Sequence, residues 1–134
     1  MKLSSKSRYG LNAMYHLALI DDYVSLTELS KQTNVSQPYL EKVLGQLKKK
    51  KLIDTLRGVQ GGYKLTKDPK EITIGEVLRA LENDLVFSDC ARAGKCNNLS
   101  CPNKGVFKVI YDRLNSVLDE LTLQDMINNK GELL

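Results

Sequence analysis

The stretch LRGVQGGYKL, residues 56–65, places three glycines between two short runs of strand-forming residues. Glycine adopts the backbone angles of tight turns at little cost. The stretch therefore predicts a β-hairpin, with strands over 53–57 and 63–65 and a turn over 58–62. Three helices are predicted upstream of it. Three helices followed by a glycine-tipped hairpin is the order of a winged helix-turn-helix.

The three upstream helices are marked by apolar residues at helical spacing. The first is expected over 5–20, with the apolar stripe Leu11, Met14, Tyr15, Ala18 and Leu19. Ser25 and Glu28 have the spacing of a capping box and open a short second helix that ends near Asn34. Ser36 is a good N-cap for the third helix, whose apolar face is Leu40, Val43, Leu44 and Leu47.

The rest of the chain is also predicted to be helical. Thr73 and Glu76 form a second capping-box pattern and open a helix through about Leu81. A long amphipathic helix begins at Gly105, with the apolar residues Val106, Val109, Ile110, Leu114, Val117, Leu118 and Leu121. A short helix over 122–129 follows. We expect a mainly α fold with a small β-wing, in which the exposed stripe of the long helix joins two copies.

Composition and charge narrow the functional classes. Hydrophobic residues make up 42% of the 134 residues, which is enough for a packed core and argues against disorder. The apolar runs are too short to span a membrane or act as a signal peptide, so a cytoplasmic protein is expected. Residues 1–70 carry 13 Lys and Arg against 6 Asp and Glu, whereas residues 71–134 carry 7 against 10. A polyanion partner is therefore expected for the first half.

The third predicted helix has the character of a DNA-recognition helix. Its exposed residues near the N-terminus would be Ser36, Gln37, Tyr39, Glu41 and Lys42. In a helix-turn-helix such residues meet base edges in the major groove, where glutamine pairs with adenine and glutamate with cytosine. Arg57, next to Gly58 on the narrow wing, suits a minor groove. The alternative for the polar residues of the third helix is that they are solvated caps, and the alternative for Arg57 is that it is a surface arginine with no role. Lys48 to Lys51 are either phosphate contacts or a solvated face.

All three cysteines lie within CARAGKCNNLSC, residues 90–101. In a reducing compartment an odd, closely spaced set indicates metal or redox chemistry more than a disulfide. Iron–sulfur clusters usually take four ligands, mostly cysteine, so three cysteines leave one position to another donor. Zinc is a competing metal, although neither spacing is the usual pair with two intervening residues. Reactive thiols near Arg92 and Lys95 are the metal-free alternative.

These motifs together resemble the Rrf-type winged-helix transcriptional regulators, most closely the iron–sulfur cluster regulators among them. The resemblance rests on LRGVQGGYKL, the opening MKLSSKSRYGLNAM, TIGEVLRALE and the clustered cysteines, and it covers nearly the whole chain. It implies a homodimer, joined by the long C-terminal helix, that binds a palindromic operator on double-stranded DNA. It places Ser36, Tyr39, Glu41, Lys42 and Arg57 at DNA-contacting positions. It implies that Cys90, Cys96 and Cys101 hold a cluster, [2Fe-2S] rather than [4Fe-4S].

The chain departs from the resembled regulators around the fourth ligand. Those regulators have a histidine three residues after the last cysteine, where this chain has Lys104, and a protonated lysine has no lone pair for iron. The second gap between cysteines is also one residue shorter. The sole histidine, His16, is expected to be packed or solvated. Asp89, Asn103, a partner side chain or water remain candidates.

The resulting prediction is a DNA-binding repressor with a winged helix-turn-helix over 1–70 and a cluster-binding loop and dimerisation helix over 71–134. Alternatives on the same fold are a cluster-free regulator of thiol redox or cysteine metabolism and a zinc-stabilised DNA-binding protein. An enzyme is not expected, because the sequence offers neither a nucleophile–base pair nor a nucleotide loop.

Overall fold

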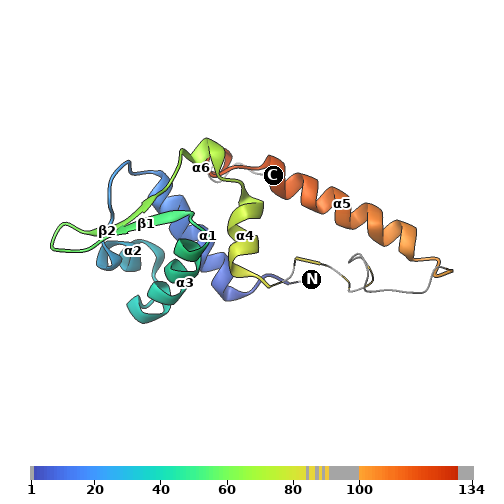
Figure 1. Cartoon of the computed structure of the whole chain (residues 1–134), viewed down its shortest axis with the longest axis horizontal. Helices are drawn as coiled ribbons and strands as arrows, with labels where there is room; N and C mark the ends of the chain where they lie inside the picture. The colour runs from blue at the N-terminus through green and yellow to red at the C-terminus, as the bar shows by residue number, and fades with distance from the viewer. Residues whose placement is uncertain (1, 84, 87, 89, 91–99, 130–134) are drawn as a thin grey trace.

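The computed structural model describes residues 2–83, 85, 86, 88, 90 and 100–129. In chain order its elements are α1 (Ser5–Ala18), α2 (Leu26–Thr33), α3 (Gln37–Lys49), β1 (Ile53–Leu56), β2 (Gly62–Leu65), the 3₁₀ turn η1 (Pro69–Glu71), α4 (Ile74–Leu81), α5 (Lys104–Glu120) and α6 (Leu123–Asn128). The helices form one body, and the two-stranded hairpin projects from one end of it (Figure 1). This arrangement confirms the predicted mainly α fold with a winged helix-turn-helix and a long C-terminal helix.

The core lies where α1, α2, α3 and α4 meet. The four residues predicted for the apolar face of α3 are all fully buried. Other elements fill the space around them with the buried side chains Met14, Leu17, Leu29, Ile53, Ile72, Val77, Leu81 and Leu123. Each fully buried aliphatic side chain contributes about 1.5–3 kcal/mol relative to an exposed one. Because these residues come from both halves of the sequence, the helix-turn-helix shares its core with α4 and α6.

α1 differs from its prediction at the C-terminal end. The helix ends at Ala18 rather than Ile20, and Leu19 is half exposed while Leu17 is buried. The amides of Leu19 and Ile20 donate to carbonyls three residues back, to His16 and Leu17, as in a tightening last turn. Since α1 contacts α2, α3, α4 and α6, its buried face is wider than a single stripe and includes Leu17.

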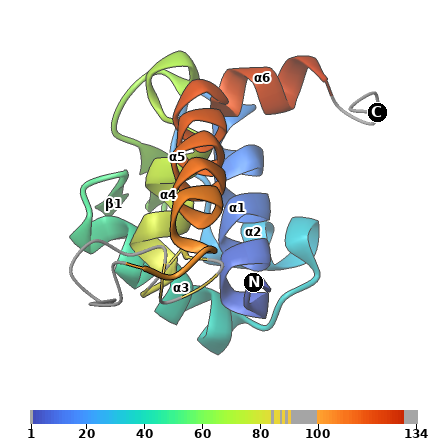
Figure 2. The same ribbon diagram turned by 90° about the vertical axis from the view of Figure 1, so that its right-hand side faces the viewer.

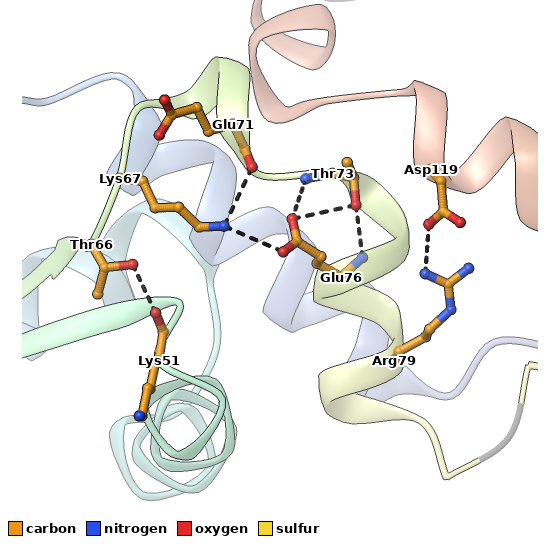
Figure 3. A network of polar contacts seen from close by, with 8 residues as sticks. All are labelled: Lys51, Thr66, Lys67, Glu71, Thr73, Glu76, Arg79 and Asp119. Atoms are coloured by element: carbon orange, nitrogen blue, oxygen red, sulfur yellow. Dashed lines mark hydrogen bonds and ion pairs between the residues drawn. The ribbon is translucent and has the colours of Figure 1, made fainter.

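Helix caps follow the predicted patterns in part. The Ser25 hydroxyl accepts the Glu28 amide (3.1 Å), but the Glu28 carboxylate accepts from Gln32 instead of completing the box. Thr73 and Glu76 form both halves of the second capping box, with amide bonds of 2.9 and 3.0 Å (Figure 3). The cap of α4 is therefore confirmed, and that of α2 is confirmed for its serine half.

The wing is a regular antiparallel hairpin one residue offset from its predicted limits. Ile53 pairs with Leu65 and Leu56 pairs with Gly62. Gly58 begins the turn at φ +116°, a backbone conformation that side chains with a Cβ rarely adopt. The hairpin is tied to the body because Val24 and Tyr63 exchange two backbone hydrogen bonds of 2.8 Å.

α5 extends away from the body on the side opposite the wing, and Figure 2 shows it in front of α4. The Arg79 guanidinium of α4 donates to Asp119 of α5 at 2.6 Å (Figure 3). It also donates to the Asn115 side chain of α5 at 2.8 Å. Across α5, which the structure describes in full, no residue is buried. In the described part of the chain, no helix is both long and apolar enough to cross a membrane.

Candidate nucleic-acid interface and cysteine segment

The start of α3 presents a cluster of polar side chains to solvent. Ser36, Gln37, Glu41 and Lys42 are all exposed there, as predicted. The Gln37 side-chain amide donates to the Thr27 hydroxyl (3.4 Å), which links α3 to α2. In the described part of the chain, the Ser36 hydroxyl makes no capping bond and is thus available to another group. The first two turns of α3 therefore present hydrogen-bond donors and acceptors of the kinds that can pair with base edges.

Tyr39 differs from its neighbours because it is only half exposed. Its ring meets the ring of Tyr9 edge-to-face, with centroids 5.9 Å apart and planes at 89°. Such pairs fix the relative position of two rings beyond what simple burial does. Tyr9, which is 38% exposed, was missed by the sequence reasoning. The sequence feature that could have identified Tyr9 is that it is an aromatic residue outside the apolar stripe of α1.

The wing places the other predicted residues at its tip. Arg57 and Gly58 are exposed directly after β1, and Val59 beside them is fully exposed. At the base of the wing, partial burial and then the negative charge of Glu41 raise the pKa of Tyr63. The charge of Glu41 on α3 thus acts on β2. The first turns of α3 and strand β2 of the wing therefore lie near one another.

The lysine run at the end of α3 lies away from the polar cluster at its start. Lys48 to Lys50 are exposed at the C-terminal end of α3, and Lys51 follows with φ +60°. At about 1.5 Å per residue, the thirteen residues of α3 span about 20 Å. The lysines cannot share a base-edge contact with Ser36, which leaves phosphate contacts or a solvated face.

Two of the three cysteines fall within the described residues. Cys90 is exposed, Cys101 is half-buried, and both are free thiols. The Cys101 carbonyl accepts the amide of Lys104 (3.2 Å), the first residue of α5. Cys96 and Asp89, together with Arg92 and Lys95, lie outside the described residues. Among the described residues there is no group of three or more His, Cys, Asp or Glu side chains that could hold a metal ion.

Of the other candidates for the fourth ligand, Asn103 is the N-cap residue of α5, two residues after Cys101, whereas His16 packs elsewhere. His16 lies in the last turn of α1, half-buried, with its ring edge-to-face against Tyr15 at 5.3 Å. Glu82, eight residues before Cys90 in the sequence, hydrogen-bonds to Ser4 at the opposite end of α1. The arrangement agrees with the prediction of a packed histidine.

The chain is similar to a known protein family, to a characterised regulator and to a solved structure. A family model named Rrf2, described as an iron-dependent transcriptional regulator, matches residues 3–129. The transcriptional regulator IscR of Escherichia coli is 34% identical over 136 aligned residues, which cover 99% of this chain and 84% of that protein. The T. potens IscR structure is 32% identical with a TM-score of 0.78, and covers 100% of this chain and 93% of its own.

A further solved structure resembles the chain equally well in fold. CymR, the global cysteine regulator of B. subtilis, is 30% identical with a TM-score of 0.83. The match covers 97% of this chain and 98% of CymR. These relatives are regulators and not enzymes, which agrees with the prediction from the sequence.

Proposed function

Because the chain belongs to the Rrf2 family of transcriptional regulators, we propose that it is a repressor whose operator binding is controlled by an iron–sulfur cluster held by Cys90, Cys96 and Cys101. DNA binding follows from the family. Control by a cluster rests on the placement of the thiols. The two described cysteines are free and stand at the two ends of the stretch 90–101, which lies within the segment that joins α4 to α5.

The residues present suit such a cluster. Cysteine thiolates are its usual ligands, and neither Cys90 nor Cys101 is committed to a disulfide. When bound, the cluster supplies an oxidant-sensitive centre. The protein's own part is to bring three thiols together, which closes the segment over 90–101. Lys104 gives no lone pair while protonated, so the fourth ligand comes from another group.

Operator recognition is assigned to the start of α3 and the tip of the wing. Ser36, Gln37, Tyr39, Glu41 and Lys42 would read base edges in the major groove, and Arg57 with Gly58 would enter the adjacent minor groove. The exposure of these residues, except for half-buried Tyr39, supports this assignment, as does the effect of the Glu41 charge on the pKa of Tyr63 in β2. A palindromic operator would then place two such surfaces one helical turn apart.

A homodimer through α5 would supply the second surface. The outward face of α5 carries apolar side chains that are 44–60% exposed: Val106, Val109, Ile110 and Val117. A contiguous apolar face of this kind marks an interaction site in a soluble protein. The contacts of Arg79 with Asp119 and Asn115 tie a different face of α5 to α4, so the apolar face is not used by them.

A second function remains compatible with the same fold. The likeness to CymR, a global cysteine regulator, favours a regulator that responds to cysteine metabolism or thiol redox state without a cluster. Lys104, in place of a ligating histidine, also favours that reading. The two functions differ in one measurable respect, because only the first requires iron and sulfide in the purified protein.

Arg57→Ala is expected to weaken operator binding by about 1–3 kcal/mol, because it removes the charge proposed to enter the minor groove. The operator is first selected from random-sequence duplex DNA with purified wild-type protein, and affinities are then compared by gel shift at fixed salt. Lys70→Ala removes one charge from η1 and should change affinity by less than about twofold. Equal affinities for wild type and Arg57→Ala would contradict the wing assignment.

A further inference from the structure

The Glu82 carboxylate makes three hydrogen bonds to the beginning of α1. Its Oε1 accepts from the Ser4 amide (2.8 Å), the Ser4 hydroxyl (2.8 Å) and the Ser7 hydroxyl (2.7 Å). Ser7 is fully buried, so the carboxylate satisfies a hydroxyl that water cannot reach. The bonds from the Ser4 amide, then from the Ser7 and Ser4 hydroxyls, lower the pKa of Glu82. The group is charged at neutral pH and strengthens these bonds.

This set of contacts, the Glu82 clasp, joins two distant parts of the sequence. Ser4 is the N-cap of α1, and Glu82 directly follows α4, where its amide donates to the Leu78 carbonyl (2.7 Å). The negative charge also lies at the positive end of the α1 dipole. The clasp therefore fixes the first turn of α1 to the last turn of α4.

The next turn of α1 leads from the clasp to the recognition helix. Gly10 packs so closely that a Cβ there would meet the Leu81 side chain of α4 and, at 3.0 Å, the Val43 side chain of α3. α1, α3 and α4 thus converge at one point. The residue before it, Tyr9, holds its ring against Tyr39 at the start of α3. Close packing transmits displacement because it leaves no free volume to absorb it.

We propose that Glu82 is a positioning residue for operator recognition: the clasp fixes Tyr9, and through it Tyr39, in the place from which α3 meets DNA. Glu82 itself belongs to neither the wing nor α3, so its proposed effect on DNA binding is indirect. The segment that carries the three cysteines follows Glu82 in the chain. We therefore expect the clasp to couple the cysteine segment to the DNA-binding surface. This second part of the proposal rests on the proposed function.

Glu82→Ala and Ser7→Ala test the first step in cluster-free protein. Both should weaken binding to the selected operator by about 3- to 20-fold, within the span of about 2- to 30-fold expected for residues that couple sites without touching a ligand. Glu76→Ala is the matched control, since it removes another helix-capping glutamate, that of Thr73. It should lower the melting temperature while leaving operator affinity within about twofold. Glu82→Gln keeps an acceptor oxygen and should lie between wild type and Glu82→Ala.

A double-mutant cycle separates positioning from simple loss of stability. If the clasp acts through Tyr9, Glu82→Ala should weaken binding no further in a Tyr9→Ala background. Combined with Arg57→Ala, which acts at the wing, its effect should remain additive. The proposal is overturned if Glu82→Ala weakens binding no more than Glu76→Ala does, or if its effect is fully additive with Tyr9→Ala. Ser7→Ala, which changes one buried hydroxyl, carries the same test if Glu82→Ala does not fold.

The coupling to the cysteine segment is measured as the ratio of operator affinities with and without the reconstituted cluster. Glu82→Ala should reduce the wild-type ratio at least by about threefold, whereas Glu76→Ala should preserve it. An unchanged ratio in Glu82→Ala contradicts the coupling. A wild-type ratio of one instead contradicts the proposed function, and the positioning role is then decided by the cluster-free affinities alone.

Discussion

Val117→Glu is expected to convert the dimer into monomers and to weaken operator binding about 100-fold or more. Val117 is half exposed on the outward face of α5, so its partner in the proposed dimer would be the same face of a second copy. In the dimer, a glutamate there would either be buried without a partner or hold the interface open to keep its charge in water. Both outcomes oppose association. A monomer reads one half-site and loses the gain of binding two at once. Sedimentation equilibrium at micromolar concentration measures the change.

Val59→Glu makes the same substitution at the fully exposed tip of the wing and serves as the control for assembly. It should sediment as a dimer, because the added charge lies far from α5. A wild-type protein that sediments as a monomer, or a Val117→Glu variant that stays dimeric, would contradict assembly through this helix.

Cys101→Ala is expected to lose iron and sulfide together. The substitution leaves at most two cysteine anchors, and a cluster that needs about four ligands is not retained by two. Cys90→Ala and Cys96→Ala should behave alike, since no ligand among the three is redundant. Anaerobic reconstitution followed by iron, sulfide and zinc analysis gives the result, and the visible absorption of the wild type should disappear with the iron.

His16→Ala is the control for this experiment, because it removes the only histidine of the sequence and leaves all three cysteines in place. It should keep the wild-type iron and sulfide content, as expected for a residue that packs on Tyr15. Full iron loading in Cys101→Ala would refute the ligand assignment. One zinc and no iron in the wild type would favour the zinc-stabilised alternative.

Local sequence patterns predicted those parts of the fold that local interactions decide. The apolar face of α3 is buried as its spacing predicted, and Thr73 with Glu76 forms the predicted capping box. The wing appears within one residue of its predicted limits because Gly58 and its neighbours can form only a few turns. In each case the determining residues lie within a few positions of one another.

Contacts between distant residues escaped prediction because no local pattern encodes them. Arg79 reaches Asp119 across 40 positions, and Glu82 reaches Ser4 across 78. One signal for the Glu82 contact was present in the sequence. Ser7 lies four residues before Leu11 and therefore on the same helix face as the predicted apolar stripe. A polar group on a buried face needs a partner, but the sequence did not name Glu82. Leu19 was misplaced for the same reason, since tertiary neighbours set the buried face of α1.

The sequence predicted which residues belong to the candidate site. The contacts that hold those residues in place could be found only in the structure. Gln37 and Tyr39 were both assigned to DNA recognition from their place after the turn at Asn34. Their contacts to Thr27 and Tyr9 became visible only once α2 and α1 were placed beside α3.

The most direct test of cluster control compares operator affinity in a single preparation of wild-type protein before and after cluster removal. Anaerobically reconstituted protein is titrated with the selected operator, and the titration is repeated after a chelator has removed the iron. Because ligation would draw the three cysteines together within the segment joining α4 to α5, we expect operator affinity to change by about 5- to 150-fold. The same treatment of Cys101→Ala should produce none. Equal affinities in wild type with and without iron, or an equal change in Cys101→Ala, would contradict the account.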